Sequence, residues 1–247
     1  MSDKWLTSQC PLQKDALLDA LLKIYDEVDI KKAVIQLDIS AIIADYINMK
    51  YGYETIEEAI KLLGGRLILN QSGNYSLVVC GGAALNAMHF VHRTTKDVDI
   101  VALIGLNDQL VDPAPLPEEI LIAAKEVADT LNLPQDWLNN GPSSGDGGLF
   151  RLGLPVGFRG RLTKNYESEK LTVYMISRED QIHFKLYAAI DQLGSYHASD
   201  LKALSPSDDE LLQAIQWTKT HDPSEGFLKA SKLFLREFGY ERLVDKI

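Results

Sequence analysis

Apolar residues between positions 14 and 48 recur every three or four residues, which is the spacing of one face of an α-helix. A further helix is predicted after Thr55, because acidic residues would lie in its first turn. Gly64 and Gly65 are expected to end this helix, since glycine is common just beyond a helix terminus. Residues 1–65 therefore predict an N-terminal helical segment.

Short apolar runs replace the helical pattern after this point. Residues 66–70 and 76–80 lie on either side of a Gln-Ser-Gly-Asn turn, and they predict a hairpin or two separate strands. The next elements are predicted to alternate, with helices at 83–90 and 117–131 and strands at 98–103 and 171–176. Such alternation is typical of an α/β core.

The sequence predicts helices again from Ser177 onward. Ser177 and Ser207 are predicted helix N-caps, because an acidic residue follows each of them three positions later. Residues 139–148 contain glycines, serines and a proline, a composition that predicts a flexible loop. The sequence thus predicts an α/β (α+β) fold in three parts: an N-terminal helical segment at 1–65, a core at 66–176 and a C-terminal helical segment at 177–247.

The composition is that of an ordinary soluble globular protein, with 46% hydrophobic and 24% charged residues among 247. The net charge of −10 excludes an overall basic field for nucleic acid, although a local basic patch stays open. Cys10 and Cys80 are not in a metal-ligand spacing, which suits a reducing compartment. No apolar run approaches the ~20 residues that span a bilayer, and residues 1–12 lack a signal-peptide core, so we expect a cytoplasmic protein without a membrane partner.

Gly81 and Gly82 stand between the predicted strand that ends at Cys80 and the helix that follows it. Backbone N–H groups at such a junction can bind an anion, and glycine lets a phosphate approach the backbone closely. The alternative is that both glycines only form a tight turn, and the glycines alone do not decide between the two. The pattern is neither a P-loop nor a dinucleotide-binding fingerprint, because it lacks the lysine and the further glycines of those motifs.

Asp97 and Asp99 lie at the start of the predicted strand at 98–103. Because side chains in a strand alternate between faces, residues two positions apart point to the same side. Two adjacent carboxylates repel each other, and a divalent cation such as Mg²⁺ relieves that repulsion. An isolated Asp-x-Asp is more often a turn acid and an exposed strand residue, but here the pair follows a strand–glycine–helix unit.

Two motifs in this region resemble the signature of the DNA polymerase beta-like nucleotidyltransferase superfamily: Gly81-Gly82-x-x-Leu85 and Arg93-Thr-Thr-Lys-Asp97-Val-Asp99-Ile. The chain is most similar to the bacterial branch that contains AbiEii-type and MenT-type toxins, and the resemblance covers roughly residues 76–205. It implies a nucleotidyltransferase fold with a small mixed sheet. It also implies transfer of a nucleoside monophosphate from a nucleoside triphosphate to an acceptor hydroxyl.

The resemblance implies roles for the residues of the first motif and of the acidic pair. Gly81 and Gly82 would hold the nucleotide phosphates, and Asp97 and Asp99 would hold Mg²⁺.

The branch also carries a lysine on a later helix and an acid beyond it, which here correspond to Lys185 and Asp200. The helical neighbours of Lys185 include Ala188 and Ala189, so its ammonium group either extends to solvent or meets a buried anion. The resemblance favours the anion, with Lys185 neutralising triphosphate charge and Asp200 orienting the lysine or acting as a base. The alternative for Asp200 is a helix N-cap.

The residues just before the acidic pair are candidates for contacts with the nucleotide. Arg93 could balance Asp97 or contact phosphate, or it could be a solvated loop charge. Thr94 and Thr95 could donate hydrogen bonds to phosphate or stabilise the turn.

The sequence departs from the wider superfamily at the third carboxylate. The predicted strand at 171–176 carries no acid, and Glu167 and Glu169 lie just before it. A single Mg²⁺ that arrives with the nucleotide is therefore expected rather than a two-metal site.

We therefore expect an Mg²⁺-dependent nucleotidyltransferase whose acceptor is RNA or tRNA, a protein or a small molecule, and which could be the toxin of a toxin–antitoxin pair. The acidic net charge argues mildly against tRNA, and an aminoglycoside-type acceptor would suit acidic walls. Two other hypotheses stay open: a nucleotide-binding member of the fold with weak or no activity, and a partner module whose terminal helices bind an antitoxin or a second copy.

Overall fold

The central strand of the sheet is β1 (Tyr75–Cys80), which pairs in parallel with β6 and antiparallel with β2. The computed structural model describes residues 56–91, 95 and 97–247. Their strands form a mixed six-stranded sheet of order β3-β2-β1-β6-β5, with β4 paired to β2. The other strands are β2 (Val98–Ile104), β3 (Leu110–Val111), β4 (Leu138–Asn139), β5 (Thr163–Glu167) and β6 (Leu171–Met175). The predicted mixed α/β (α+β) class is confirmed.

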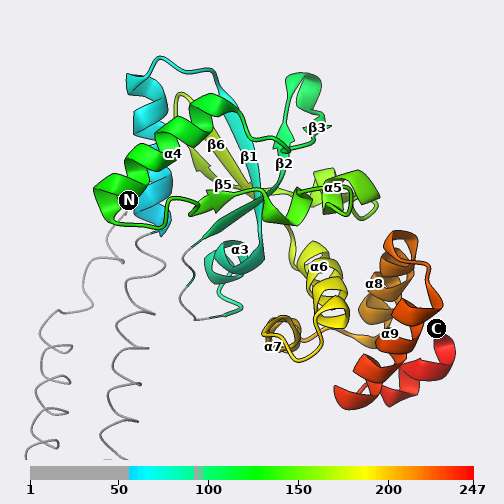
Figure 1. Cartoon of the computed structure of the whole chain (residues 1–247). Coiled ribbons are helices and arrows are strands. Elements are labelled where there is room, and N and C mark those ends of the chain that lie inside the picture. Colours follow the sequence, from blue (N-terminus) through cyan, green and yellow to red (C-terminus); the bar gives the residue numbers. More distant parts are fainter. Residues whose placement is uncertain (1–55, 92–94, 96) are drawn as a thin grey trace, which may run out of the picture. The chain divides into compact units, whose positions relative to one another are not determined.

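The helices cover the sheet and continue beyond it as a separate group, formed by α6 to α9, which lies beside the sheet in Figure 1. The α-helices that follow β1 are α3 (Gly81–Ala87), α4 (Glu118–Leu131), α5 (Leu149–Leu152), α6 (Arg178–Asp191), α7 (His197–Ala203), α8 (Asp208–His221) and α9 (Glu225–Glu237). Short 3-10 helices are η1 (Leu106–Asp108), η2 (Gly141–Ser143), η3 (Phe158–Arg161) and η4 (Glu241–Lys246).

The two predicted N-caps begin α6 and α8. The Ser177 hydroxyl accepts a hydrogen bond from the Asp180 N–H, and Ser207 forms a capping box with Glu210. Both predictions are confirmed, because a serine at this position satisfies a backbone N–H that has no partner within the helix.

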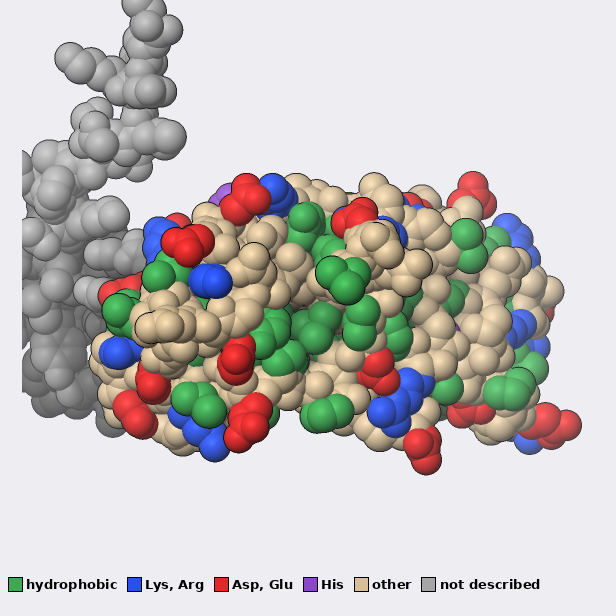
Figure 2. Space-filling view, turned by 90° about the horizontal axis from the view of Figure 1, so that it is seen from above, with side chains coloured by type: hydrophobic (Ala, Val, Ile, Leu, Met, Phe, Trp, Pro, Cys, Tyr) green, Lys and Arg blue, Asp and Glu red, His purple; other side chains and the backbone are tan. Residues whose placement is uncertain are grey.

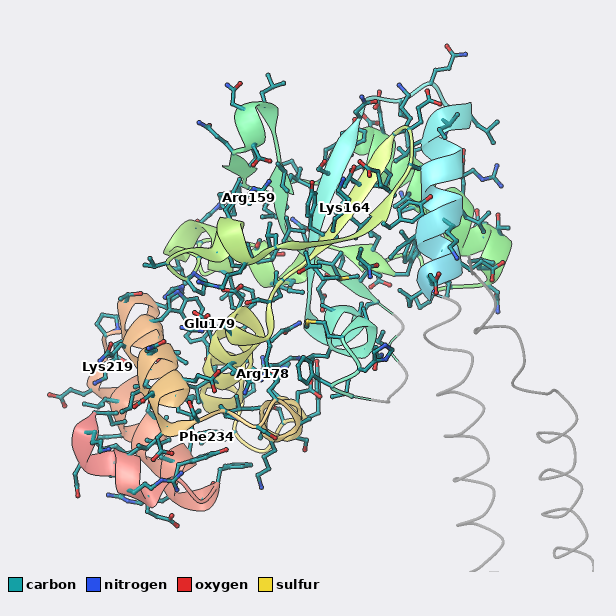
Figure 3. All side chains as sticks on the ribbon, turned by 180° about the vertical axis from the view of Figure 1, so that it is seen from behind. Arg159, Lys164, Arg178, Glu179, Lys219 and Phe234 are labelled. Atoms are coloured by element: carbon teal, nitrogen blue, oxygen red, sulfur yellow. The ribbon has the colours of Figure 1, made fainter. Side chains whose placement is uncertain are left out.

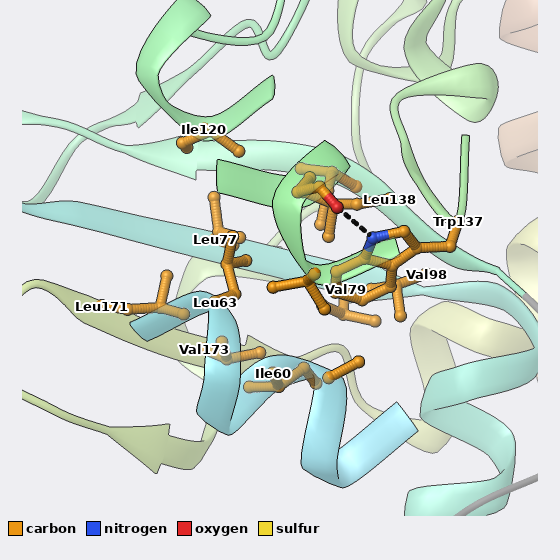
Figure 4. Packing of buried hydrophobic residues seen from close by; sticks show 14 of the residues in the cluster. Ile60, Leu63, Leu77, Val79, Val98, Ile120, Trp137, Leu138, Leu171 and Val173 are labelled. Carbon is orange, nitrogen blue, oxygen red and sulfur yellow. Dashed lines mark hydrogen bonds between the residues drawn. The ribbon is translucent and has the colours of Figure 1, made fainter. Parts of the chain in front are cut away.

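Alternate residues of β1 enter different cores. Leu77 and Val79 pack beneath α4 and the helix at residues 56–69, where Trp137 donates a hydrogen bond to the Ala124 carbonyl at 2.9 Å (Figure 4). Val78 and Cys80 enter a second core on the opposite side of the strand. This period of two places the C-terminal end of β1 between two apolar layers.

The predicted strand at 66–70 is wrong, because residues 56–69 form one helix that passes through Gly64 and Gly65. Leu63 and Leu67 are fully buried and continue the apolar face of this helix. A Cβ atom at Gly64 would come within 2.9 Å of the Ser168 Oγ atom. Gly64 therefore allows close packing against the β5–β6 turn, and it does not end the helix.

The segment 139–148 is folded against the sheet, in contrast to the predicted flexible loop. It contains part of β4 and all of η2, and the buried Ser143 hydroxyl donates a hydrogen bond to the Val101 carbonyl at 2.8 Å. A Cβ atom at Gly148 would overlap the backbone of Ser143. Glycine thus serves close packing in this segment rather than flexibility alone.

The C-terminal helices α6 to α9 share a core of their own, which includes Leu186, Leu211 and Phe234. Leu85 of α3 belongs to the same core, so the helix that follows β1 packs against the C-terminal helices. On the other side of α6, Phe184 joins the core beneath β1 and β2. The helix α6 is therefore held between the sheet and the C-terminal group.

The chain divides into two compact units, residues 1–47 and 48–247. The predicted helix at 14–48 lies outside the described residues, and the three-part division at 65 and 176 stays a prediction. No helix in the described ranges is long and apolar enough to cross a membrane.

We predict that Leu77→Ala, which removes a fully buried side chain from the central strand, lowers the free energy of unfolding by about 2–5 kcal/mol. Leu106→Ala is the matched control, because Leu106 is 90% exposed and its loss is expected to change stability by less than about 0.5 kcal/mol. Denaturant unfolding measures both. Equal effects of the two substitutions would contradict the position of the core.

Candidate functional site

A cavity of about 380 Å³ lies between the end of β1, the segment after β4 and the helices α6 and α7. Its size is within the range of roughly 300–1,000 Å³ that is typical of small-molecule sites. Four residues predicted for the site line it: Gly81, Asp97, Asp99 and Lys185. The other lining residues are Cys80, Gly141, Pro142, Gly147, Leu149, Gln181, Phe184, Tyr187, Ala188, Asp191, Gln192, Tyr196 and His197.

Gly81 and Asp99 meet at one end of this cavity. Cys80 pairs with Asp99 across β1 and β2, which brings the next residue, Gly81, against the Asp99 side chain. Gly81 has a φ of +69°, and a Cβ atom there would overlap a carboxylate oxygen of Asp99. Glycine is required at this position for two reasons, the left-handed backbone and the closeness of the carboxylate.

Asp97 lies two residues before Asp99 and lines the same cavity, as the spacing of the two acids predicts. Its carboxylate is exposed, and it accepts a hydrogen bond from the buried Thr95 hydroxyl at 2.9 Å. Thr95 therefore orients Asp97 and is not itself a lining residue. The predicted contacts of Arg93 and Thr94 lie outside the described residues.

Lys185 and Asp200 form a buried ion pair, which joins α6 to α7. The Lys185 Nζ atom is 2.8 Å from an Asp200 carboxylate oxygen, and the two side chains are 5% and 3% exposed. The Lys185 ammonium group also lies 5.5 Å from the centre of the Tyr196 ring. Burial of either charge alone would be costly, so the pair fixes the lysine at the cavity wall.

The buried Cys80 thiol lies at the end of β1 and lines the same cavity as Asp99 and Lys185. Burial raises the pKa of the Cys80 thiol well above its usual range, the Asp99 carboxylate raises it further, and Lys185 opposes the shift. The thiol is therefore uncharged at neutral pH and is unsuited to act as a nucleophile. Asp99 pairs with Cys80 across β1 and β2, and Lys185 lines the same cavity as both residues.

Several residues that line the cavity were not predicted from the sequence. Gln181 and Lys185 are four residues apart on α6, so helical spacing could have identified Gln181 once Lys185 was chosen. Asp191 lies further along the same helix. The segment from Gly141 to Leu149 carried no comparable signal, because its position depends on packing against β2.

Several residues considered earlier lie away from the cavity. Gly82 is buried and is not among the lining residues, and neither Glu167 nor Glu169 is. The basic residues near β5, two of which are labelled in Figure 3, each form an ion pair: Arg159 with Asp108, Arg161 with Asp180, and Lys164 with Glu167. This cluster is therefore a charged surface rather than an open basic patch.

The donor set at the glycine end suits a hard cation. Asp97 and Asp99 offer carboxylate oxygens to the cavity, and Mg²⁺ typically takes one or two carboxylates together with substrate phosphates and water. In the described part of the chain, no group of three or more His, Cys, Asp or Glu side chains could hold a metal ion. Mg²⁺ held by this carboxylate pair would complete its coordination with water or with a bound substrate.

Comparison of the chain with protein-family models, curated proteins and solved structures gives no match.

We predict that Gly81→Ala destabilises the protein more than Gly145→Ala does. Both glycines have a positive φ, +69° and +66°, but a Cβ atom at Gly145 meets open space. Gly145→Ala is expected to cost about 1–2 kcal/mol through backbone strain alone. Gly81→Ala is expected to cost about 1–3 kcal/mol more, because Asp99 must move.

Denaturant unfolding of both variants, repeated in an Asp99→Ala background, tests this difference. The extra cost at Gly81 should disappear when the carboxylate is removed. An extra cost that persists without Asp99 would contradict the close approach.

We also predict a non-additive response at the buried ion pair. Lys185→Met alone should cost about 3–5 kcal/mol of unfolding free energy, because it leaves the Asp200 charge buried and unpaired. The double substitution Lys185→Met with Asp200→Leu should recover most of that stability, since neither charge then remains. Additive losses in thermal and denaturant unfolding would be the contrary result.

Proposed function

We propose that this cavity is the active site of an Mg²⁺-dependent nucleotidyltransferase with a DNA polymerase beta-like fold. The observation that carries the proposal is the convergence of Gly81, Asp97, Asp99 and Lys185 on one cavity from segments far apart in sequence. Each of these residue types suits a triphosphate: glycine by close approach, carboxylates through a cation, and lysine by charge. The resemblance described above assigns the same residues.

Asp97 and Asp99 would hold Mg²⁺ that arrives with the nucleotide. Bound Mg²⁺ supplies neutralisation of phosphate charge and orientation of the reacting phosphoryl group. Thr95 keeps one Asp97 oxygen in place by its hydrogen bond, and the Gly81 backbone keeps Asp99 in place by contact. The carboxylate pair would thus be ordered before the substrate binds.

Lys185 would contact the triphosphate as negative charge develops on the leaving group. Its ammonium group is buried, and electrostatic stabilisation is stronger where water is excluded. Asp200 would act as the positioning residue that holds the lysine side chain at the cavity wall.

The proposed reaction is attack of an acceptor hydroxyl oxygen on the α-phosphorus of a nucleoside triphosphate. A new oxygen–phosphorus bond forms, the bond to the β-phosphate oxygen breaks, and pyrophosphate leaves. The hydroxyl proton would pass to a carboxylate of the Asp97 and Asp99 pair, which lines the cavity.

The charges that line the cavity favour a cationic small-molecule acceptor over RNA. Asp97, Asp99 and Asp191 are acidic, whereas Lys185 is the one lysine or arginine among the described lining residues and is already paired with Asp200. Figure 2 shows a face on which acidic and basic side chains are interspersed rather than gathered by sign. A polyanion would require a basic surface, and an amine-bearing acceptor would not.

We predict that the protein transfers label from an α-labelled nucleoside triphosphate to an acceptor, and that Asp99→Asn reduces the transfer by at least about 100-fold. The assay uses each of the four triphosphates with Mg²⁺, against total RNA and against an amine-rich metabolite fraction. Asp129→Asn is the matched control, because this exposed aspartate lies on α4 outside the cavity.

The outcomes separate the competing functions. Label in the amine fraction supports the acceptor proposed above, whereas label in RNA supports the tRNA-modifying toxin. Mg²⁺-dependent nucleotide binding without transfer would favour a binding role, through an antitoxin or a second copy of the chain. If the wild-type protein binds none of the four triphosphates, the proposal is refuted.

A further inference from the structure

Gln181 is fully buried, and only one of the two polar atoms of its side-chain amide has a hydrogen-bond partner among the described residues. Its Nε2 atom donates a hydrogen bond to the Gly81 carbonyl oxygen at 3.2 Å. The Oε1 atom is buried and has no hydrogen-bond partner in the described part of the chain. The bond to Gly81 fixes the orientation of the amide, since the reverse orientation would bring two oxygen atoms together.

A buried acceptor without a partner lowers stability, and most buried polar groups avoid this state. An apolar side chain of similar length would fill the same space without leaving an unsatisfied oxygen. The amide at position 181 is therefore a poor choice for stability alone. Its donor group holds the Gly81 carbonyl oxygen.

The site connects Gln181 to the residues proposed to bind phosphate. Gly81 lies against the Asp99 carboxylate, so a movement of its backbone would displace that side chain. Lys185 lies one helical turn after Gln181 on α6, and both residues line the cavity. The hydrogen bond thus links the glycine turn to the helix that carries the lysine.

We infer that Gln181 is a positioning residue that keeps the Gly81 turn in register with Lys185. This inference rests on the proposed function, in which both of those residues contact the triphosphate. The bond between α6 and the turn fixes the distance between the glycine–carboxylate end and the ammonium group. A displacement of even ~1 Å at a reacting centre can cost on the order of 100-fold in rate.

The test separates this role from a structural one, because the two make opposite predictions about stability. We expect Gln181→Met and Gln181→Leu to melt close to the wild type, since removal of the unsatisfied Oε1 atom offsets the loss of the hydrogen bond to the Gly81 carbonyl. We expect both variants to bind Mg²⁺–nucleoside triphosphate at least tenfold more weakly in calorimetry. Variants that melt well below the wild type, or that bind the triphosphate as tightly, would overturn the inference.

Thr218→Val is the matched control. Thr218 is fully buried on α8 and donates a hydrogen bond to the Ile215 carbonyl, but it does not line the cavity. Its replacement is expected to leave nucleotide affinity unchanged. A loss of affinity in this control equal to that of Gln181→Met would show a general effect of buried polar groups and would contradict the inference.

A double-substitution cycle tests the link to Lys185. If Gln181 acts by keeping the turn in register with the lysine, Gln181→Met should weaken binding less than twofold in a Lys185→Met background, compared with at least tenfold alone. Independent effects would overturn the inference. A wild-type protein that binds no Mg²⁺–triphosphate would instead refute the proposed function, which is a distinguishable result.

Discussion

Gly81 lies so close to the Asp99 carboxylate that any side chain at position 81 would displace this carboxylate. The approach depends on a backbone conformation that favours glycine and on a strand pairing that sets Cys80 opposite Asp99. It exposes backbone and carboxylate together at the wall of one cavity. The other parts of the site are arranged around this contact.

The helix α6 brings the opposite charge to that contact. It is held between the core under the sheet and the core of the C-terminal helices, and it presents Gln181 and Lys185 one turn apart. Asp200 of α7 compensates the lysine charge at 2.8 Å, so a cation is kept where water is excluded. Burial of such an ion pair adds little net stability, because the cost of desolvating both charges offsets their attraction.

Local signals in the sequence were sufficient for much of the fold. The serine caps of α6 and α8 depend on neighbours along the chain and were predicted correctly. Asp97 and Asp99, which are two residues apart, line one cavity. The helix through Gly64 was not predicted, because that glycine packs against Ser168, about a hundred residues later in the sequence. The hydrogen bond from Gln181 to Gly81 could not be predicted for the same reason, since the two residues are equally distant in sequence.

The central claim is that Asp97 and Asp99 hold a divalent cation together with a nucleoside triphosphate, beside Gly81 and Lys185. A crystal structure with Mn²⁺ and a non-hydrolysable triphosphate, with anomalous scattering measured for the metal, tests it most directly. The account predicts a metal peak bound by both carboxylates, at about 2.0–2.3 Å, and phosphates within hydrogen-bond distance of the Lys185 ammonium group. A nucleotide bound elsewhere, or a metal that avoids both carboxylates, would contradict it.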